Sequence, residues 1–274
     1  MSTRPGVPRN LPALLVSLYE RKHTGTVVVS GAPGGRIHLR EGRIAGVETP
    51  GAPGVETVVL NSGRVDYAAW TAACVSAGGA EGVLAAELET RGLLQRQEFE
   101  IICTATVFDG AFALALGAPE GWEVTEAVPA PWSGQSFTPQ RLADQTTRRL
   151  AALAGLWGAP PAELSRSRIR PAADLPARIP VRYTTLLRTA NGRRTPRDIA
   201  FVLGRGVYAV MLDLARMNES GLLRRDRPAV DSGRPSAAPR RPEDRPPDDA
   251  PAAGSSPLPR RAPGTHHPHR TATP

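Results

Sequence analysis

The chain has 274 residues, 41% of them apolar, which is enough to bury the core of one large or two small domains. That composition excludes a chain that is disordered throughout, and the sequence holds no run of about eighteen uninterrupted apolar residues, as a membrane-spanning helix requires. Because the N-terminus leads into an amphipathic segment without the hydrophobic region of a signal peptide, we expect a cytoplasmic protein that stays off the membrane.

The net charge of +8 is distributed unevenly along the chain. Residues 1–127 include 10 basic and 14 acidic residues, whereas residues 128–227 include 17 basic and 7 acidic ones. All basic residues except Lys22 are arginine, a usage typical of a GC-rich genome, but such a bias would act on both halves equally. The basic second half is therefore the candidate for binding an anionic partner.

The first predicted element is an amphipathic helix with Asn10 as its N-cap. We expect it to end at Gly25 and to bury one face on which four leucines recur at helical spacing: Leu11, Leu14, Leu15 and Leu18. Three short strands follow, joined by tight turns. They are predicted at residues 26–30, 36–40 and 43–48 and form an antiparallel meander.

Helical segments punctuated by glycine are predicted through residues 54–117. Asp66 is the expected N-cap of one of them, and the alternation around Trp122 predicts a closing strand. Cys74 and Cys103 lie within apolar helical patterns, where a cysteine is usually a small hydrophobic residue. We therefore expect two buried thiols rather than a nucleophile or a metal site.

The order of these elements resembles a known family. The leucine-rich helix, "TGTVVV", the hairpin "GRIHLREGRIAGVE" and "EFEIICTATVFDGAFALALGAPEGWEV" together resemble the PATAN-type domain, a domain of unknown function found in bacterial signalling and regulatory proteins. The resemblance covers residues 10–128. It implies an α+β interaction domain without known catalytic residues, which receives or assembles signals through a protein partner.

Residues 129–179 are predicted to be a linker that contains one helix. Thr138 is the expected N-cap and Pro139 the first helical residue. The apolar face of this helix is expected to comprise Leu142, Leu150, Leu153 and Trp157. Residues 159–178 are expected to be loop-like.

The pattern of residues 180–227 predicts three helices and a short strand. Pro180 opens the first helix, Thr195 and Asp198 form a capping box at the start of the second, and Gly204 ends it. This arrangement resembles a winged helix-turn-helix domain of the MarR type. The expected core residues of the second and third helices are Ile199, Val202, Leu203, Val207, Val210, Met211, Leu214 and Met217.

In such a domain the third helix is the one that meets DNA. Its outward residues are expected to be Tyr208, Ala209, Leu212, Asp213, Arg216 and Glu219. They are poor base readers, because the two carboxylates would repel the DNA backbone, whereas arginines beside the helix are suited to phosphate contacts. The alternative is that these arginines only form a solvated face. The predicted DNA-binding residues are Arg193, Arg194, Arg197, Arg205, Tyr208, Arg216, Arg224 and Arg225.

Other signals are weak. The glycine-rich "GAPGGR" lacks the lysine and the following helix of a phosphate-binding loop, so a hairpin turn explains it better. His23 and His38 stand alone, and the "HHPH" near the C-terminus lacks the setting of a designed metal site. No catalytic set has a recognisable motif, so we expect a non-enzymatic protein without cofactor or metal. Residues 228–274 are rich in Pro, Ala and Arg and are predicted to be disordered.

The predicted fold class is α+β: a small antiparallel meander with packed helices, followed by a mostly α winged helix-turn-helix domain. Two functions remain open. The first is a transcriptional regulator that binds double-stranded DNA, as a homodimer by analogy with other winged helices, and that meets a signalling protein through its N-terminal domain. The second is a signalling adaptor whose two domains both bind proteins.

Overall fold

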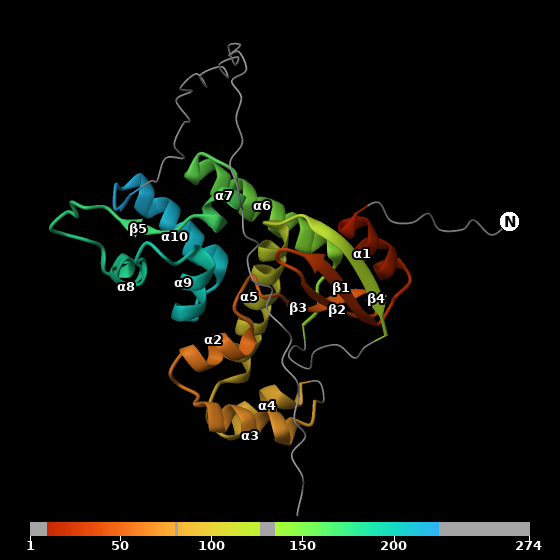
Figure 1. Cartoon of the computed structure of the whole chain (residues 1–274). Coiled ribbons are helices and arrows are strands. Elements are labelled where there is room, and N and C mark those ends of the chain that lie inside the picture. Colours follow the sequence, from red (N-terminus) through yellow and green to blue (C-terminus); the bar gives the residue numbers. More distant parts are fainter. Residues whose placement is uncertain (1–9, 80–81, 127–134, 225–274) are drawn as a thin grey trace, which may run out of the picture. The chain divides into compact units, whose positions relative to one another are not determined.

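The computed structural model describes residues 10–79, 82–126 and 135–224 (Figure 1). The chain divides into two units, Met1–Arg227 and Pro228–Pro274. The expected disordered tail therefore lies outside the described residues. The described part is α+β, as predicted, and contains a four-stranded antiparallel sheet, a two-stranded sheet and ten helices.

The four-stranded sheet contains the predicted meander and its closing strand. Its order is β3-β2-β1-β4, where β1 is Gly25–Gly31, β2 is Gly35–Arg40, β3 is Arg43–Glu48 and β4 is Pro119–Thr125. All neighbouring strands are antiparallel. The prediction of three strands and a later fourth is therefore confirmed.

Helix α1 (Leu11–Glu20) packs its leucine face on this sheet. The Asn10 side chain accepts a hydrogen bond from the Ala13 N–H at 2.9 Å, so the predicted N-cap is confirmed. The predicted end at Gly25 is wrong: the helix stops at Glu20, and Gly25 is the first residue of β1. Gly25 has no room for a side chain there, because a Cβ would lie 2.3 Å from the Thr125 carbonyl oxygen of the neighbouring strand.

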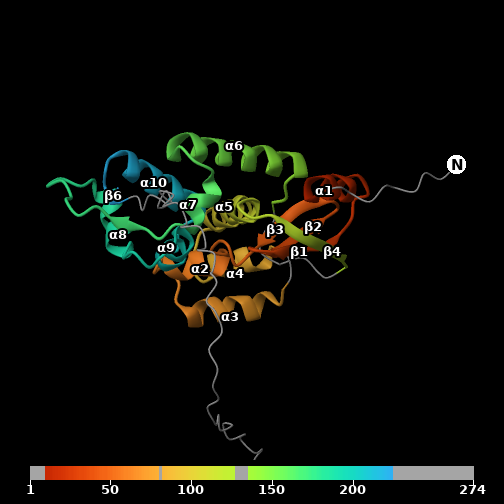
Figure 2. The ribbon, with the colours of Figure 1, turned by 45° about the horizontal axis from the view of Figure 1, so that its top comes forward.

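Four helices follow the meander: α2 (Val55–Asn61), α3 (Tyr67–Ala77), α4 (Val83–Thr90) and α5 (Arg96–Ala115). Asp66 caps α3, as predicted, by accepting a hydrogen bond from the Ala69 N–H at 2.7 Å. The first half of α5 packs with α2, α3 and α4 in one apolar cluster that includes Trp70 and Phe99. The second half packs on the sheet, so α5 connects the two (Figure 2).

The C-terminal part contains α6 (Pro139–Trp157), α7 (Pro161–Arg166), α8 (Val181–Thr189), α9 (Pro196–Leu203) and α10 (Val207–Glu219). It also contains the short strands β5 (Arg170–Pro171) and β6 (Leu223–Arg224), which pair antiparallel. The expectation that residues 159–178 are loop-like is therefore wrong in part. Leu164 and Ile169 are buried in the core of this region and hold α7 and β5 in place.

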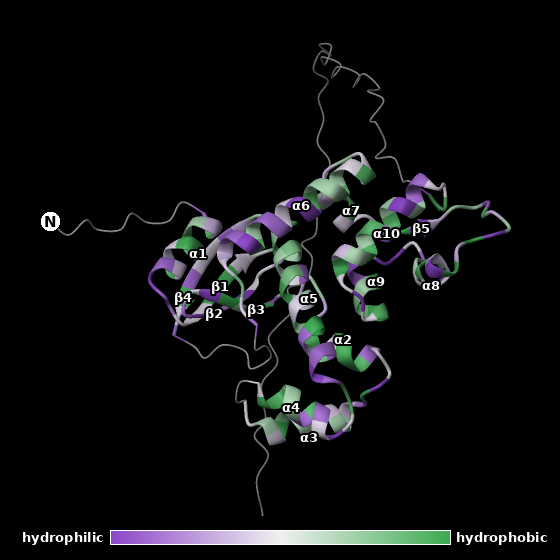
Figure 3. Ribbon diagram, turned by 180° about the vertical axis from the view of Figure 1, so that it is seen from behind, coloured by the Kyte–Doolittle hydropathy of each residue, from purple (hydrophilic) through white to green (hydrophobic). Residues whose placement is uncertain are grey.

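One hydrophobic core crosses the domain boundaries expected at residues 128/129 and 179/180. It joins Phe112 and Ala113 of α5 to Leu153 of α6, and these to the buried face of α10. In Figure 3 the hydrophobic residues of α5 continue toward α9 and α10. The three C-terminal helices are therefore packed as part of the same compact body as the sheet.

The predicted starts of α6 and α9 are confirmed. Thr138 caps α6, and Thr195 and Asp198 form a complete capping box at the start of α9. All five apolar residues predicted to line α10 are buried. On α9, however, Val202 is 50% exposed, contrary to expectation, because it lies roughly a third of a turn away from the face centred on Pro196, Ile199 and Ala200.

We predict that Asp198→Asn lowers the free energy of unfolding by about 1 kcal/mol at neutral pH. The Thr195 backbone N–H donates to the Asp198 carboxylate at 2.9 Å and holds the pKa of Asp198 below its usual 3.8. A carboxylate with a lowered pKa in the folded state contributes stability at pH values above its pKa in the unfolded chain. This contribution is lost as the pH falls through its pKa in the folded state. Urea unfolding of the wild type and the variant should therefore differ most near pH 7 and converge as the pH falls below about 4. A constant difference across this range would contradict the assignment.

Candidate functional site

Three backbone segments meet at the two-stranded sheet. Arg170 of β5 is the partner of Arg224 of β6. On the other side of β5, the Ile169 N–H donates to the Arg194 carbonyl at 3.0 Å, and the Gly192 N–H donates to the Ile169 carbonyl at 2.8 Å. The turn between α8 and α9 and the segment after α10 therefore both lie against β5.

This arrangement collects five arginines, which we call the arginine surface: Arg168, Arg170, Arg193, Arg194 and Arg224. Arg168 donates to the Arg193 carbonyl, and the Arg170 side chain lies over Gly192, where a Cβ would come within 2.7 Å of its Nε. Arg194 is half-buried and the other four are exposed. Within the described part of the chain, no carboxylate lies within 4 Å of any of the five guanidinium groups.

The pairing of Arg170 with Arg224 is electrostatically unfavourable. Directly opposed residues of two antiparallel strands have neighbouring side chains, and like charges at such positions destabilise the pair. An anion placed between the two guanidinium groups would remove this repulsion.

The strand that follows α10 is not part of a wing-like hairpin in the described structure. β6 pairs with β5, which precedes the three helices in sequence. Arg225, the last predicted DNA-binding residue, lies outside the described residues. The chain after β6, where any further strand of a wing would lie, is outside the described residues.

The backbone N–H groups at the start of α10 are hydrogen-bonded to a residue of α5. The Asp109 carboxylate accepts hydrogen bonds from the backbone N–H groups of Val207 at 2.6 Å and Tyr208 at 2.9 Å. The Tyr208 ring packs edge-on against Phe112, with 5.1 Å between ring centroids, and the Arg149 guanidinium lies over it at 4.8 Å. Tyr208 therefore points into the molecule, not outward as expected, because α5 and α6 cover this side of α10.

Asp109 and Arg149 form a buried pair beneath α10. Their side chains are 7% and 18% exposed, and Arg149 Nη1 lies 3.9 Å from Asp109 Oδ1. Burial raises the pKa of Asp109, and the two backbone N–H groups and Arg149 act in the opposite direction. Burial also lowers the pKa of Arg149, against the attraction of Asp109.

Three further predicted DNA-binding residues are engaged in contacts within the chain. Arg205 pairs with Asp213 at 2.7 Å, and Arg216 lies 4.0 Å from the same carboxylate. Arg197 donates from Nε to the Pro50 carbonyl at 2.5 Å and its guanidinium lies over the Phe201 ring. Of the seven predicted residues that the structure describes, it thus brings together Arg193, Arg194 and Arg224.

Sequence reasoning missed Arg168 and Arg170 because their segment was expected to be a loop. The signal was present in "RIR" after the end of α7, where arginine occupies alternate positions at Arg168 and Arg170. Alternation with a period of two places side chains on one side of an extended chain. Ile169, which points the other way, is buried, as this pattern requires.

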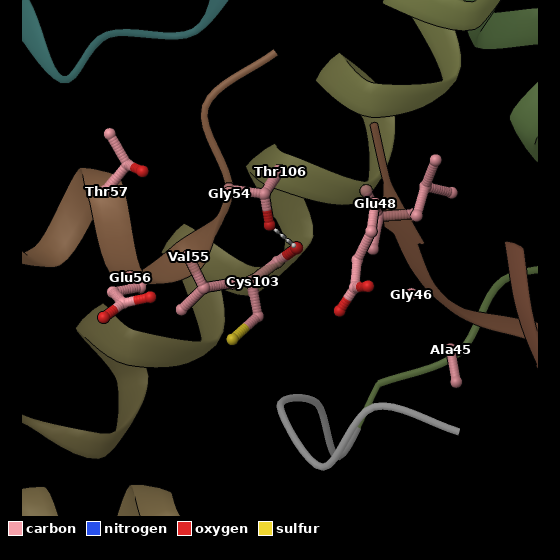
Figure 4. Close-up of a pocket in the computed structure, with 11 residues that line it drawn as sticks. Ala45, Gly46, Glu48, Gly54, Val55, Glu56, Thr57, Cys103 and Thr106 are labelled. Carbon is pink, nitrogen blue, oxygen red and sulfur yellow. Dashed lines mark hydrogen bonds between the residues drawn. The ribbon is translucent and has the colours of Figure 1, made fainter. Parts of the chain in front are cut away.

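A small pocket of about 180 Å³ lies between β3, the start of α2 and α5 (Figure 4). Cys103 faces it between Glu48 and Glu56, and the Thr106 hydroxyl donates to the Cys103 carbonyl at 2.8 Å. Burial, with a smaller contribution from Glu100, raises the pKa of Cys103 to about 12. At neutral pH this thiol is protonated and is a poor nucleophile. Cys103 is buried, as predicted, whereas Cys74 is only half-buried.

A second, larger hollow of about 460 Å³ lies between α1, α6 and the end of α5. Leu11, Leu15, Leu114 and Leu142 contribute to its walls, and every residue that lines it is uncharged.

The described residues contain no group of three His, Cys, Asp or Glu side chains that could hold a metal ion. His38 is buried and lies 3.0 Å from the Thr26 hydroxyl through Nδ1, in agreement with a packed histidine.

We predict that Asp109→Ala lowers the free energy of unfolding by about 3 kcal/mol, because it leaves the Val207 and Tyr208 N–H groups without their acceptor and the Arg149 guanidinium without its neighbouring negative charge. Chemical denaturation monitored by circular dichroism provides the measurement. Asp144→Ala is the matched control: Asp144 is exposed on α6, accepts only from Gln140, and its loss should change stability by less than about 0.5 kcal/mol. Equal effects of the two substitutions would show that Asp109 does not anchor α10.

No family model, curated protein or solved structure matches this chain. The resemblances to PATAN-type and MarR-type domains stay predictions. Among the described helices, none combines the length and the apolar character needed to cross a bilayer.

Proposed function

We propose that the protein is a cytoplasmic, non-enzymatic DNA-binding regulator that contacts the phosphate backbone through the arginine surface. The α+β part, which resembles a PATAN-type domain, is then the part that meets a signalling protein. The observation that carries the proposal is the convergence of five arginines from three segments around the β5–β6 sheet, without a carboxylate within 4 Å among the described residues.

Arginine chemistry supports a phosphate partner. The guanidinium group is planar, stays charged at every physiological pH and forms paired hydrogen bonds with phosphate oxygens. Arg170 and Arg224, which are register partners in the β5–β6 pair, provide two such groups on neighbouring strands. Their mutual repulsion means that bound phosphate is stabilised by both the new contacts and the loss of the unfavourable pair.

The mode of binding we propose is reading of the backbone rather than of the bases. A helix-turn-helix reads bases with the N-terminal residues of its recognition helix, which in this chain would be α10. At that end of α10 the N–H groups are bonded to Asp109, and Tyr208 packs on Phe112 and Arg149. Phosphate contacts position a protein on DNA without selecting a sequence. We therefore expect weak dependence on sequence and strong dependence on salt.

Because the start of α10 is already bonded to Asp109, a second candidate is also favoured. It is a signalling adaptor that binds proteins through both the α+β part and the C-terminal helices. In that case the arginine surface meets an acidic segment of a partner protein. The two candidates differ in their affinity for duplex DNA.

The test is binding of the full chain to random-sequence duplex DNA across a series of salt concentrations. If each of the five arginines neutralises one phosphate, the logarithm of the binding constant should fall with the logarithm of salt concentration at a slope of about −4.5. The triple variant Arg170→Ala, Arg193→Ala, Arg224→Ala should reduce that slope by about 3 and weaken binding by at least about tenfold.

The matched control removes the same amount of charge elsewhere. Arg21, Arg36 and Arg148 are exposed and have no ion pair among the described residues, so their triple alanine variant should retain the wild-type slope. Equal losses in both triple variants would mean that only net charge matters and would contradict a defined surface. Weak binding that neither variant changes would favour the adaptor.

A further inference from the structure

A cavity of about 500 Å³ lies where the sheet meets the C-terminal helices. One wall is the loop that joins β1 to β2, together with Pro50 and Gly51 after β3. The opposite wall consists of the end of α7 and the first turn of α9. The volume is in the range of sites that bind small molecules, about 300–1,000 Å³.

The lining of this cavity is positively charged on one side and apolar on the other. Arg166 of α7 and Arg197 of α9 line it, and no acidic residue does. Ala113, Leu116 and Val207 supply the apolar side. Such a lining favours a ligand that has an anionic group and a small apolar body, because an unpaired cation in a site gains most from a charged partner.

Arg197 is held in a fixed position. Its Nε donates to the Pro50 carbonyl at 2.5 Å, and its guanidinium carbon lies 5.4 Å from the centre of the Phe201 ring. Its two terminal amino groups have no hydrogen-bond partner within the described structure. A side chain that is already positioned loses little conformational entropy when a ligand binds, so these two groups are preorganised donors.

The cavity includes the glycine-rich loop that sequence reasoning set aside. "GAPGGR" has no lysine of its own, but the fold places Arg166 and Arg197 opposite it, more than 130 residues later in the chain. The glycines themselves are explained by packing: at Gly51, for example, a Cβ would lie 2.9 Å from Pro33 and 3.1 Å from Ala113. The case for a ligand therefore depends on the cavity and the two arginines.

We propose that this cavity binds a compact organic anion, with a phosphate or carboxylate group between Arg166 and Arg197 and an apolar body against Ala113, Leu116 and Val207. The site is a concave hollow of limited volume, whereas the arginine surface is an exposed edge, so it suits a small molecule rather than a polymer. A ligand there contacts both the hairpin loop of the sheet and helices α7 and α9. Binding would stabilise the packing of these two parts against each other.

The test is isothermal titration of the full chain, without DNA, with phenyl phosphate, benzoate and the uncharged benzyl alcohol. Either or both anions should bind saturably and benzyl alcohol should not, and comparison of the two anions identifies the preferred group. Arg166→Gln and Arg197→Gln should each weaken binding by about tenfold or more, as expected for the loss of a charge-assisted hydrogen bond. Arg148→Gln, on the exposed side of α6, should leave binding unchanged.

Three results would overturn the proposal. The first is the absence of saturable binding of either anion up to about 10 mM, because a Kd in the millimolar range would still be detected. The second is equal binding of benzyl alcohol, and the third is an equal loss in Arg148→Gln. Arg166→Gln keeps the test valid if Arg197→Gln disturbs folding, since the Arg166 side chain has no hydrogen bond or ion pair within the described residues. None of these results depends on whether the chain binds DNA.

Discussion

The packing of α10 depends on one buried carboxylate. Asp109 lies in the half of α5 that packs on the sheet, and it accepts the first two free N–H groups of α10. A helix start that is buried without such a partner would leave polar groups unsatisfied. The negative charge also matches the positive end of the α10 dipole, and Arg149 lies beside it. This contact ties the C-terminal helices to α5 and decides which faces of them reach solvent.

Two of the faces that remain open are positively charged, but they differ in shape. The arginine surface is an exposed edge built on a two-stranded sheet, to which distant segments each contribute arginine. The cavity beside the hairpin loop is a concave hollow lined by two arginines and an apolar wall. An extended surface suits a polyanion, since charge can be neutralised at several points, whereas a concave site of limited volume suits a single anionic group. The arginines of the basic second half thus contribute to two different kinds of surface, an exposed edge and a concave hollow.

Much of the local structure was predictable from sequence because it is decided by neighbouring residues. Caps such as Asn10, Asp66 and Thr138 accept hydrogen bonds three residues ahead, and the capping box at Thr195 and Asp198 closes within one turn. Strand alternation and helical spacing of apolar residues depend on similarly short distances. The alternation that leads into β5 was readable by the same rule and was missed because residues 159–178 were expected to be loop-like.

The sequence by itself determined the α+β class, the start of most helices, the meander and the location of the basic residues in the second half of the chain. Only the tertiary structure decided which of those basic residues lie together. Tyr208 was expected to face outward because the apolar stripe of an isolated helix covers one side, but α5 and α6 cover a second side of α10. Arg168 and Arg170 join Arg193 and Arg224 because β5 inserts between two later segments. Such contacts join residues tens to about a hundred positions apart, and no local periodicity encodes them.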